Sequence, residues 1–341
     1  MGRTKALLRD ARFTTGIVMR RPFSVLLQLT NRCNMQCSFC DFWPNAAPKK
    51  EELTLADYQR IAKELAETGC YAVSIEGGEP FVRPDLVEIV KAFGQHHVPM
   101  LFTNGWYVTR ENAKALWDAG LVHADVSIDY PDALRHDKKR GMLGATERAW
   151  RAVEHFRETA PKAGKQVNVM TVIMEDNYAD LEPLFEKSAA ANVGQHVTLI
   201  SVSGYRRGKG GDALPPPEAA DRLMRLFERF PHVRYFESYF STMKTFLSGA
   251  KSEMPTCSAG TQGFNIDHIG NVAPCIERIG EPVGNVKEDS IQSLLKKLRA
   301  KQDVVKSCQD CWTACRGFQQ ALGGGASVAA FKDLATRMRV D

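Results

Sequence analysis

Strand-like and helix-like stretches alternate along roughly the first 200 residues of this 341-residue chain. Ser24–Thr30 is a short apolar stretch, and Thr54–Glu67 has apolar residues at helical spacing with Thr54 as the expected N-cap. The expected strands and helices that follow are Tyr71–Glu76, Asp85–Gln95, Pro99–Thr103, Arg110–Ala119, Val122–Ile128, Ala145–Glu158, Val167–Ile173, Ala179–Ala191 and His196–Val202. Six such units in a row predict an α/β fold with a parallel sheet and right-handed crossovers.

Composition and charge narrow the class of protein. Hydrophobic residues make up 44% and charged residues 25% of the chain, as in ordinary globular proteins. No apolar run is long enough to span a bilayer, and Met1–Pro22 lacks the apolar core of a signal peptide, so a cytoplasmic protein is expected.

The net charge of +5 is concentrated at the N-terminus, where the first 22 residues carry six basic side chains and one acidic one. The neutral remainder argues against an extended nucleic-acid surface. The basic segment is either a solvated arm or a weak contact for an acidic partner or a membrane surface.

Nine cysteines are many for a reducing compartment, where clustered thiols indicate metal binding or catalysis rather than disulfides. Three of them, Cys33, Cys37 and Cys40, lie within eight residues directly after the first expected strand. Three thiolates can hold three irons of a [4Fe–4S] cluster, which leaves the fourth iron open to a small chelating molecule. The alternatives are a zinc site, with Asp41 as a fourth ligand, or unrelated core cysteines. Cys70 stands alone and is expected to be a small buried side chain.

The CxxxCxxC spacing, with Phe39 before the last cysteine, resembles the signature of the radical S-adenosylmethionine (SAM) superfamily. The resemblance implies a partial (β/α)6 barrel, whose open iron chelates SAM. Reductive cleavage of SAM then yields a 5′-deoxyadenosyl radical that abstracts hydrogen from a substrate. It also implies a reducing partner such as flavodoxin or ferredoxin.

Further matches to that family follow the expected strands, where a barrel presents its functional residues. Gly77-Gly78-Glu79-Pro80 resembles the family's GGEP motif, whose backbone and Glu79 would hold the SAM amino group. Asn104 lies in a TNG match, and Ser127 or Asp129 would contact the SAM ribose. Arg140, in the HDKKRG stretch, would pair with the SAM carboxylate because its planar fork suits a carboxylate.

A second cysteine group stands near the C-terminus, and its members are Cys257, Cys275, Cys308, Cys311 and Cys315. It resembles a SPASM domain, a C-terminal extension that carries auxiliary clusters, but five cysteines rather than seven point to the shorter twitch form with one auxiliary [4Fe–4S] cluster. Cys257, Cys275, Cys308 and Cys311 are the first choice of ligands, with Cys315 as a substitute or a neighbour of the cluster. A Cys₄ zinc site is the alternative.

These observations divide the chain into five expected parts. They are a basic arm over residues 1–23, a radical SAM partial barrel over 24–214, a linker with a helix over 215–256, a small α+β twitch or SPASM-like domain over 257–322, and a tail helix over 323–341.

The expected function is radical SAM catalysis: dehydrogenation, cross-linking or rearrangement of a small molecule or a ribosomally made peptide. Action on a lipid-like substrate, or activation of a protein partner, is an alternative. The alternative to an enzyme is a non-catalytic iron–sulfur sensor, but a sensor does not require the SAM-binding motifs. The residues do not identify a substrate-side acid or base.

Overall fold

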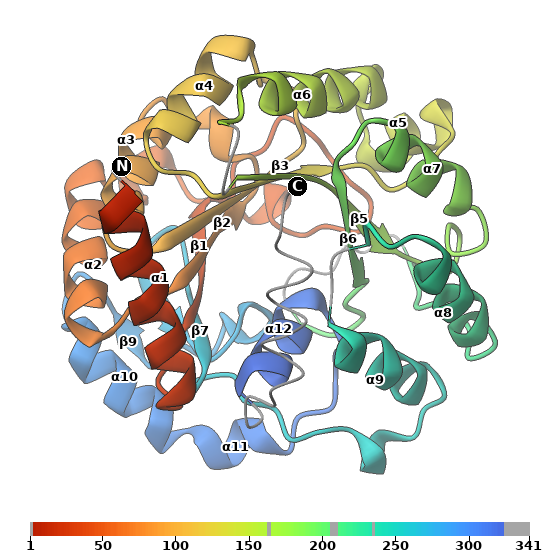
Figure 1. Cartoon of the computed structure of the whole chain (residues 1–341). Coiled ribbons are helices and arrows are strands. Elements are labelled where there is room, and N and C mark those ends of the chain that lie inside the picture. The colour runs from red at the N-terminus through yellow and green to blue at the C-terminus, as the bar shows by residue number, and fades with distance from the viewer. Residues whose placement is uncertain (1–2, 162–164, 205–210, 234–235, 324–341) are drawn as a thin grey trace.

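The computed structural model describes residues 3–161, 165–204, 211–233 and 236–323 (Figure 1). The expected helix Ser327–Arg339 and part of the loop expected at Tyr205–Pro217 lie outside these residues. Six strands and the helices between them follow the expected order, except that helix α5 (Ala133–Arg140) was not predicted. They are β1 (Ser24–Thr30), α2 (Leu55–Thr68), β2 (Ala72–Gly77), α3 (Leu86–Gly94), β3 (Val98–Thr103), α4 (Arg110–Asp118), β4 (His123–Ser127), α5 (Ala133–Arg140), α6 (Ala145–Thr159), β5 (Gln166–Ile173), α7 (Glu182–Ala190) and β6 (Gly194–Leu199).

The six strands pair in parallel with their neighbours in chain order, from β1 at one side to β6 at the other. The sheet curves, and the helices surround it as an incomplete ring (Figure 1). The prediction of a partial barrel with six parallel strands is therefore confirmed.

The C-terminal region continues this sheet. Strand β7 (Gly263–Ile266) pairs in parallel with β1, and Leu27 lies opposite Ile266. Strands β8 (Asn271–Ala273) and β9 (Gly284–Asn285) then add an antiparallel hairpin, so the sheet has nine strands within the described residues. The sequence predicted a small α+β domain, but its pairing with β1 came only from the structure.

Five helices complete the C-terminal part of the described chain. They are α8 (Ala219–Arg229), α9 (Glu237–Leu247), α10 (Ile291–Ala300), α11 (Gln302–Lys306) and α12 (Ala314–Gly323). Helix α8 matches the expected helix near 218–230, whereas α9, α10, α11 and α12 were not predicted.

Alternation along the strands explains where the core lies. Val25, Leu27 and Leu29 of β1 belong to the main apolar cluster that also contains the inner faces of the surrounding helices. Helix α2 buries Tyr58 and Ile61 in it, at the helical spacing seen in the sequence. The predicted N-cap is confirmed, since the Thr54 side chain accepts a hydrogen bond from the Asp57 N–H in a capping box.

The basic N-terminal segment is helical, as α1 (Arg3–Val18). Phe13 meets Phe23 edge to face with ring centroids 6.3 Å apart, and Arg12 donates to the Ala66 carbonyl at 2.7 Å. Leu7 and Leu8 point to solvent. Within the described residues, α1 and every other helix are too short or too polar to cross a membrane.

Candidate functional site

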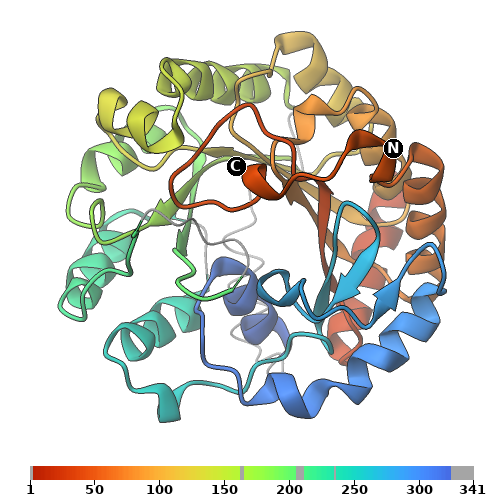
Figure 2. The same cartoon turned by 180° about the vertical axis from the view of Figure 1, so that it is seen from behind.

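The loop that carries Cys33, Cys37 and Cys40 leaves β1 at the edge where the parallel strands end, and it crosses in front of the sheet in Figure 2. Two backbone hydrogen bonds fasten it to the end of α5: the Gln36 N–H donates to Arg140 and the Ser38 N–H donates to Lys139, both at 3.2 Å. The loop is therefore positioned by backbone contacts that do not depend on its side chains.

Burial makes free thiolates unfavourable in this loop. Burial raises the pKa of Cys33 to about 12, helped by the charges of Glu79, Cys37 and Cys40 and opposed by the Met35 N–H. Burial also raises the pKa of Cys37, although the Arg140 guanidinium opposes it. Thiolates here need nearby positive charge, which a bound metal would supply, and thiols that coordinate a metal lose their protons. The donor set thus fits an iron–sulfur cluster.

The described part of the chain contains no group of three or more His, Cys, Asp or Glu side chains arranged to hold a single metal ion. A zinc ion requires its ligands to converge on one point, whereas a [4Fe–4S] cluster takes each thiolate on a different iron.

The GGEP stretch packs directly against the start of the cysteine loop. The Gly78 N–H donates to the Thr30 carbonyl at 2.7 Å, and the Glu79 N–H donates to the Arg32 carbonyl at 3.0 Å. A Cβ on Gly77 would lie 2.3 Å from the Thr30 oxygen, and one on Gly78 would lie 2.2 Å from the Arg32 oxygen. Both glycines are thus required by contact with the chain's own backbone, independently of any ligand.

Glu79 joins this turn to the TNG turn after β3. Its side chain is fully buried and accepts hydrogen bonds from the Asn104 N–H and the Thr103 hydroxyl, each at 2.8 Å, and from the Phe81 N–H at 3.1 Å. Burial raises its pKa to about 7, although these bonds oppose the shift. The Asn104 side chain donates to Asn34 at 2.9 Å, which ties the same turn to the cysteine loop. Pro80 is buried and opens the 3₁₀ turn Pro80–Val82.

Arg140 and Asp129 form a buried ion pair beside Cys37. The Arg140 Nε and Nη2 atoms lie 2.8 and 2.6 Å from Asp129 Oδ2, and the guanidinium stacks 5.2 Å from the centre of the Phe39 ring. His136 accepts a hydrogen bond from the Asp129 N–H at 3.1 Å. Ser127, the last residue of β4, lies half-buried two residues before Asp129. The structure therefore brings Phe39, Asp129 and Arg140 together at the cysteine loop.

All five C-terminal cysteines line one cavity of about 200 Å³. Burial raises the pKa of Cys311 to about 12 and that of Cys275 well above its usual value, and nearby thiols reinforce both shifts. Cys308 donates to Asp310 at 3.4 Å, and the Thr313 hydroxyl and the Cys315 thiol lie 3.0 Å apart. Here too buried thiols converge where positive charge is needed, which fits a metal cluster.

Arg316 lines the same cavity and was missed by the sequence reasoning. Its Nη1 donates to the Cys311 carbonyl at 2.9 Å and its Nη2 to the Pro255 carbonyl at 2.7 Å, while its buried Nε has no hydrogen-bond partner. A buried cation with an unused donor would suit an anionic, thiolate-ligated cluster in this cavity. Its position directly after Cys315 was the available signal.

Family models match both parts of the chain that contain clustered cysteines. The model of the radical SAM superfamily matches residues 27–187, and that of SPASM, an iron–sulfur cluster-binding domain, matches residues 257–312. The second range contains Cys257, Cys275, Cys308 and Cys311 and ends before Cys315.

Two curated relatives and one solved structure extend the match over most of the chain. Mycofactocin maturase MftC of Mycobacterium tuberculosis is 30% identical over 314 residues, covering 87% of this chain and 78% of the relative. An AdoMet-dependent heme synthase of Methanosarcina barkeri is 27% identical over 320 residues, covering 85% and 88%. The structure of anSMEcpe with bound AdoMet and the Cp18Cys peptide has a TM-score of 0.65 at 17% identity, covering 93% of this chain and 96% of that one. That structure supports the fold.

Proposed function

The chain belongs to the radical SAM superfamily and carries a C-terminal SPASM iron–sulfur domain, and on this premise we propose that it catalyses a two-electron oxidation of its substrate. A [4Fe–4S] cluster held by Cys33, Cys37 and Cys40, with SAM bound, would supply the 5′-deoxyadenosyl radical that abstracts hydrogen. The oxidation would be a dehydrogenation or a cross-link.

The observation that carries this proposal is the convergence of buried groups on the cysteine loop. Three thiols, the ion pair of Arg140 with Asp129, and the Glu79 carboxylate lie at one end of the strands. In this role Arg140 binds the carboxylate of SAM while Asp129 holds its guanidinium in place. Glu79 accepts from the amino group of SAM and fixes the turns after β2 and β3.

The role proposed for the C-terminal cavity is to hold one auxiliary cluster. After the substrate has lost a hydrogen atom, this cluster would take an electron from the substrate radical. Its five thiols exceed the four that one cluster needs, so every iron can be bound by protein without substrate. Cys257, Cys275, Cys308 and Cys311 are the proposed ligands. Arg316, beside them, would stabilise the added negative charge.

The names of the relatives and of the solved structure cover a maturase, a heme synthase and a complex with a peptide. We therefore confine the proposal to the type of reaction, with a small molecule or a peptide as substrate. Flavodoxin or ferredoxin would supply the electron with which the first cluster cleaves SAM. A cytoplasmic location would suit this chemistry. The basic N-terminal arm, residues 1–23, is proposed as a weak contact for an acidic partner or a membrane surface.

The test is whether the reduced, anaerobically reconstituted chain converts SAM to 5′-deoxyadenosine and methionine. Chromatography of the wild type and of Cys70→Ala, a control outside both cysteine groups, should show both products. A chain that binds iron and sulfide but never forms 5′-deoxyadenosine would be a sensor rather than an enzyme.

A further inference from the structure

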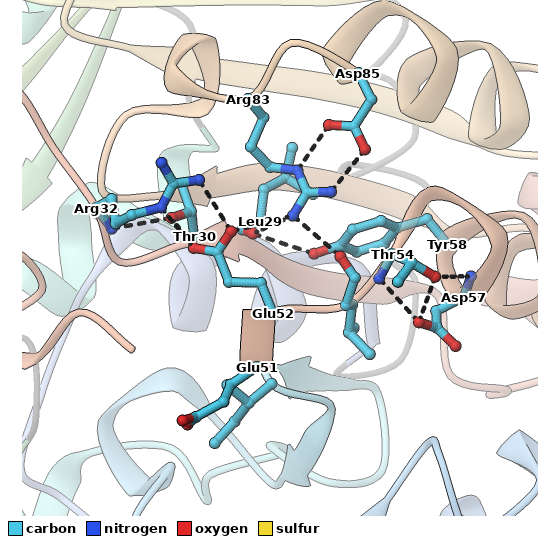
Figure 3. Close-up of polar contacts among 12 residues, drawn as sticks. Leu29, Thr30, Arg32, Glu51, Glu52, Thr54, Asp57, Tyr58, Arg83 and Asp85 are labelled. Carbon is cyan, nitrogen blue, oxygen red and sulfur yellow. Dashed lines mark hydrogen bonds and ion pairs between the residues drawn. The ribbon is translucent and has the colours of Figure 1, made fainter. Parts of the chain in front are cut away.

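Glu52 lies between the cysteine loop and the SPASM domain, in the segment Glu51–Leu53 that precedes α2 (Figure 3). Its side chain is buried, with the residue 5% exposed, whereas Glu51 is exposed and its carboxylate points away from the network in Figure 3. A buried carboxylate is costly unless it is fully paired, so its partners indicate its role.

On one side the Glu52 carboxylate holds the residues that lead into Cys33. Arg32 donates to it from Nε and Nη2, both at 3.0 Å, and the Thr30 hydroxyl donates a further, short hydrogen bond. The Arg32 backbone carbonyl is the group that accepts from Glu79. Glu52 therefore fixes the side chain of the residue whose backbone carries the GGEP contact.

A second guanidinium completes the pairing. Arg83 Nη1 lies 3.4 Å from Glu52 and donates to the Leu53 carbonyl at 3.1 Å, while Asp85 accepts from Arg83 Nε and Nη2 at 3.0 and 2.7 Å. Two carboxylates and two guanidiniums thus form one neutral network. Such a network fixes geometry because removal of one member leaves a buried charge unpaired.

The backbone on either side of Glu52 is bonded to the SPASM domain. The Leu53 N–H donates to the His268 carbonyl in the β7–β8 turn at 2.8 Å, and Lys287 donates to the Glu51 carbonyl at 3.0 Å. The segment therefore contacts the cysteine loop through one side chain and the SPASM domain through its main chain.

We propose that Glu52 is a positioning residue for the cluster at Cys33, Cys37 and Cys40, because it fixes the start of the cysteine loop against the SPASM domain. The inference rests on the proposed function and adds a residue outside both cysteine groups. Glu52→Gln keeps the shape of the side chain but removes its charge and sets an amide N–H₂ among donors. The cysteine loop should then lose its fixed geometry while its thiols remain.

The test compares Glu52→Gln with Glu51→Gln, the same chemical change one residue away. In the metal-free chain, hydrogen exchange of the amides in residues 31–40 should be faster in Glu52→Gln and unchanged in Glu51→Gln. After reconstitution, SAM should alter the electron paramagnetic resonance spectrum of the reduced first cluster less in Glu52→Gln. Formation of 5′-deoxyadenosine should fall about ten- to a hundredfold, as expected for loss of a charge-assisted hydrogen bond. Glu51→Gln should match the wild type in both.

Equal exchange of residues 31–40 in the two variants, or an unchanged response to SAM in Glu52→Gln, would overturn the proposal. If Glu52→Gln does not fold, Arg32→Gln/Glu52→Gln replaces it, because this double variant no longer leaves the Arg32 guanidinium without its carboxylate partner. If the double variant is stable but its electron paramagnetic resonance spectrum still responds weakly to SAM, Glu52 positions the first cluster. If the double variant recovers both stability and the response to SAM, the role of Glu52 is purely structural. A wild type that forms no 5′-deoxyadenosine contradicts the proposed function alone, and the exchange comparison on the metal-free chain still decides the role of Glu52.

Discussion

The two groups of cysteines are brought together in different ways. Cys33, Cys37 and Cys40 lie within eight residues, on a loop that backbone hydrogen bonds fix to α5 and to the GGEP turn. The five C-terminal cysteines span residues 257–315 and meet only because strands, turns and helices carry them to one cavity. A local motif thus builds the first site, whereas tertiary packing builds the second, and the two should respond differently to mutation.

The largest expected difference comes from removing one ligand of the first site. Cys37→Ala should abolish 5′-deoxyadenosine formation because the remaining two thiols cannot hold a cluster with an open iron. About four irons per chain should remain, since the C-terminal site is intact. Iron analysis and chromatography of the reduced chain check both values. Undiminished SAM cleavage in this variant would be incompatible with the assignment.

The C-terminal cavity should keep its cluster when Cys315 is removed but lose it when Cys311 is removed. Cys311→Ala should lower the iron content from about eight to about four per chain while slow SAM cleavage continues. Cys315→Ala should keep about eight, because Cys315 is the proposed spare. The opposite pattern in paired iron and sulfide analyses would exchange the roles of these two thiols.

Arg140→Lys should weaken SAM binding while both clusters still assemble. Lysine keeps the charge but not the planar fork that bonds to Asp129, so the expected loss in SAM binding is about 1–3 kcal/mol. Lys138→Arg, an exposed change in the same helix, is the matched control. Calorimetric titration with SAM measures both, and equal affinities in the two variants would move the carboxylate-binding role to another residue.

The smallest expected difference is in the pH dependence of stability. Burial lowers the pKa of His136 from its ordinary 6.5 to about 4, so the folded chain keeps this imidazole neutral. The unfolded chain takes up the proton first, and the stabilising contribution, complete above about pH 6.5, is lost as the pH falls toward 4.

No histidine among the described residues lines the C-terminal cavity. Because glutamine takes up no proton in this pH range, His136→Gln should lose less unfolding free energy than the wild type between pH 7 and pH 5. The difference should be on the order of 1 kcal/mol, measured by urea denaturation of the metal-free chain. An identical pH dependence in both chains would mean that His136 makes no contribution.

Most of the barrel was predictable because its signals are local. Apolar strands, helical periodicity and the Thr54 cap each depend on neighbouring residues, and the six parallel strands followed from their order. The N-terminal helix α1 was missed because its charges dominate the pattern. The structure adds a requirement at Gly77 and Gly78 that the sequence did not reveal, since a Cβ at either would clash with the backbone of Thr30 or Arg32.

The sequence by itself determined the alternating α/β order and the two groups of thiols, because spacing within a few residues sets secondary structure and local ligand geometry. Only the tertiary structure decided that β7 extends the sheet beside β1, that Asp129 pairs with Arg140, and that Glu52 meets Arg32 and Arg83. These contacts join residues far apart in the chain, and the packing of the whole sheet determines which distant polar groups are buried together.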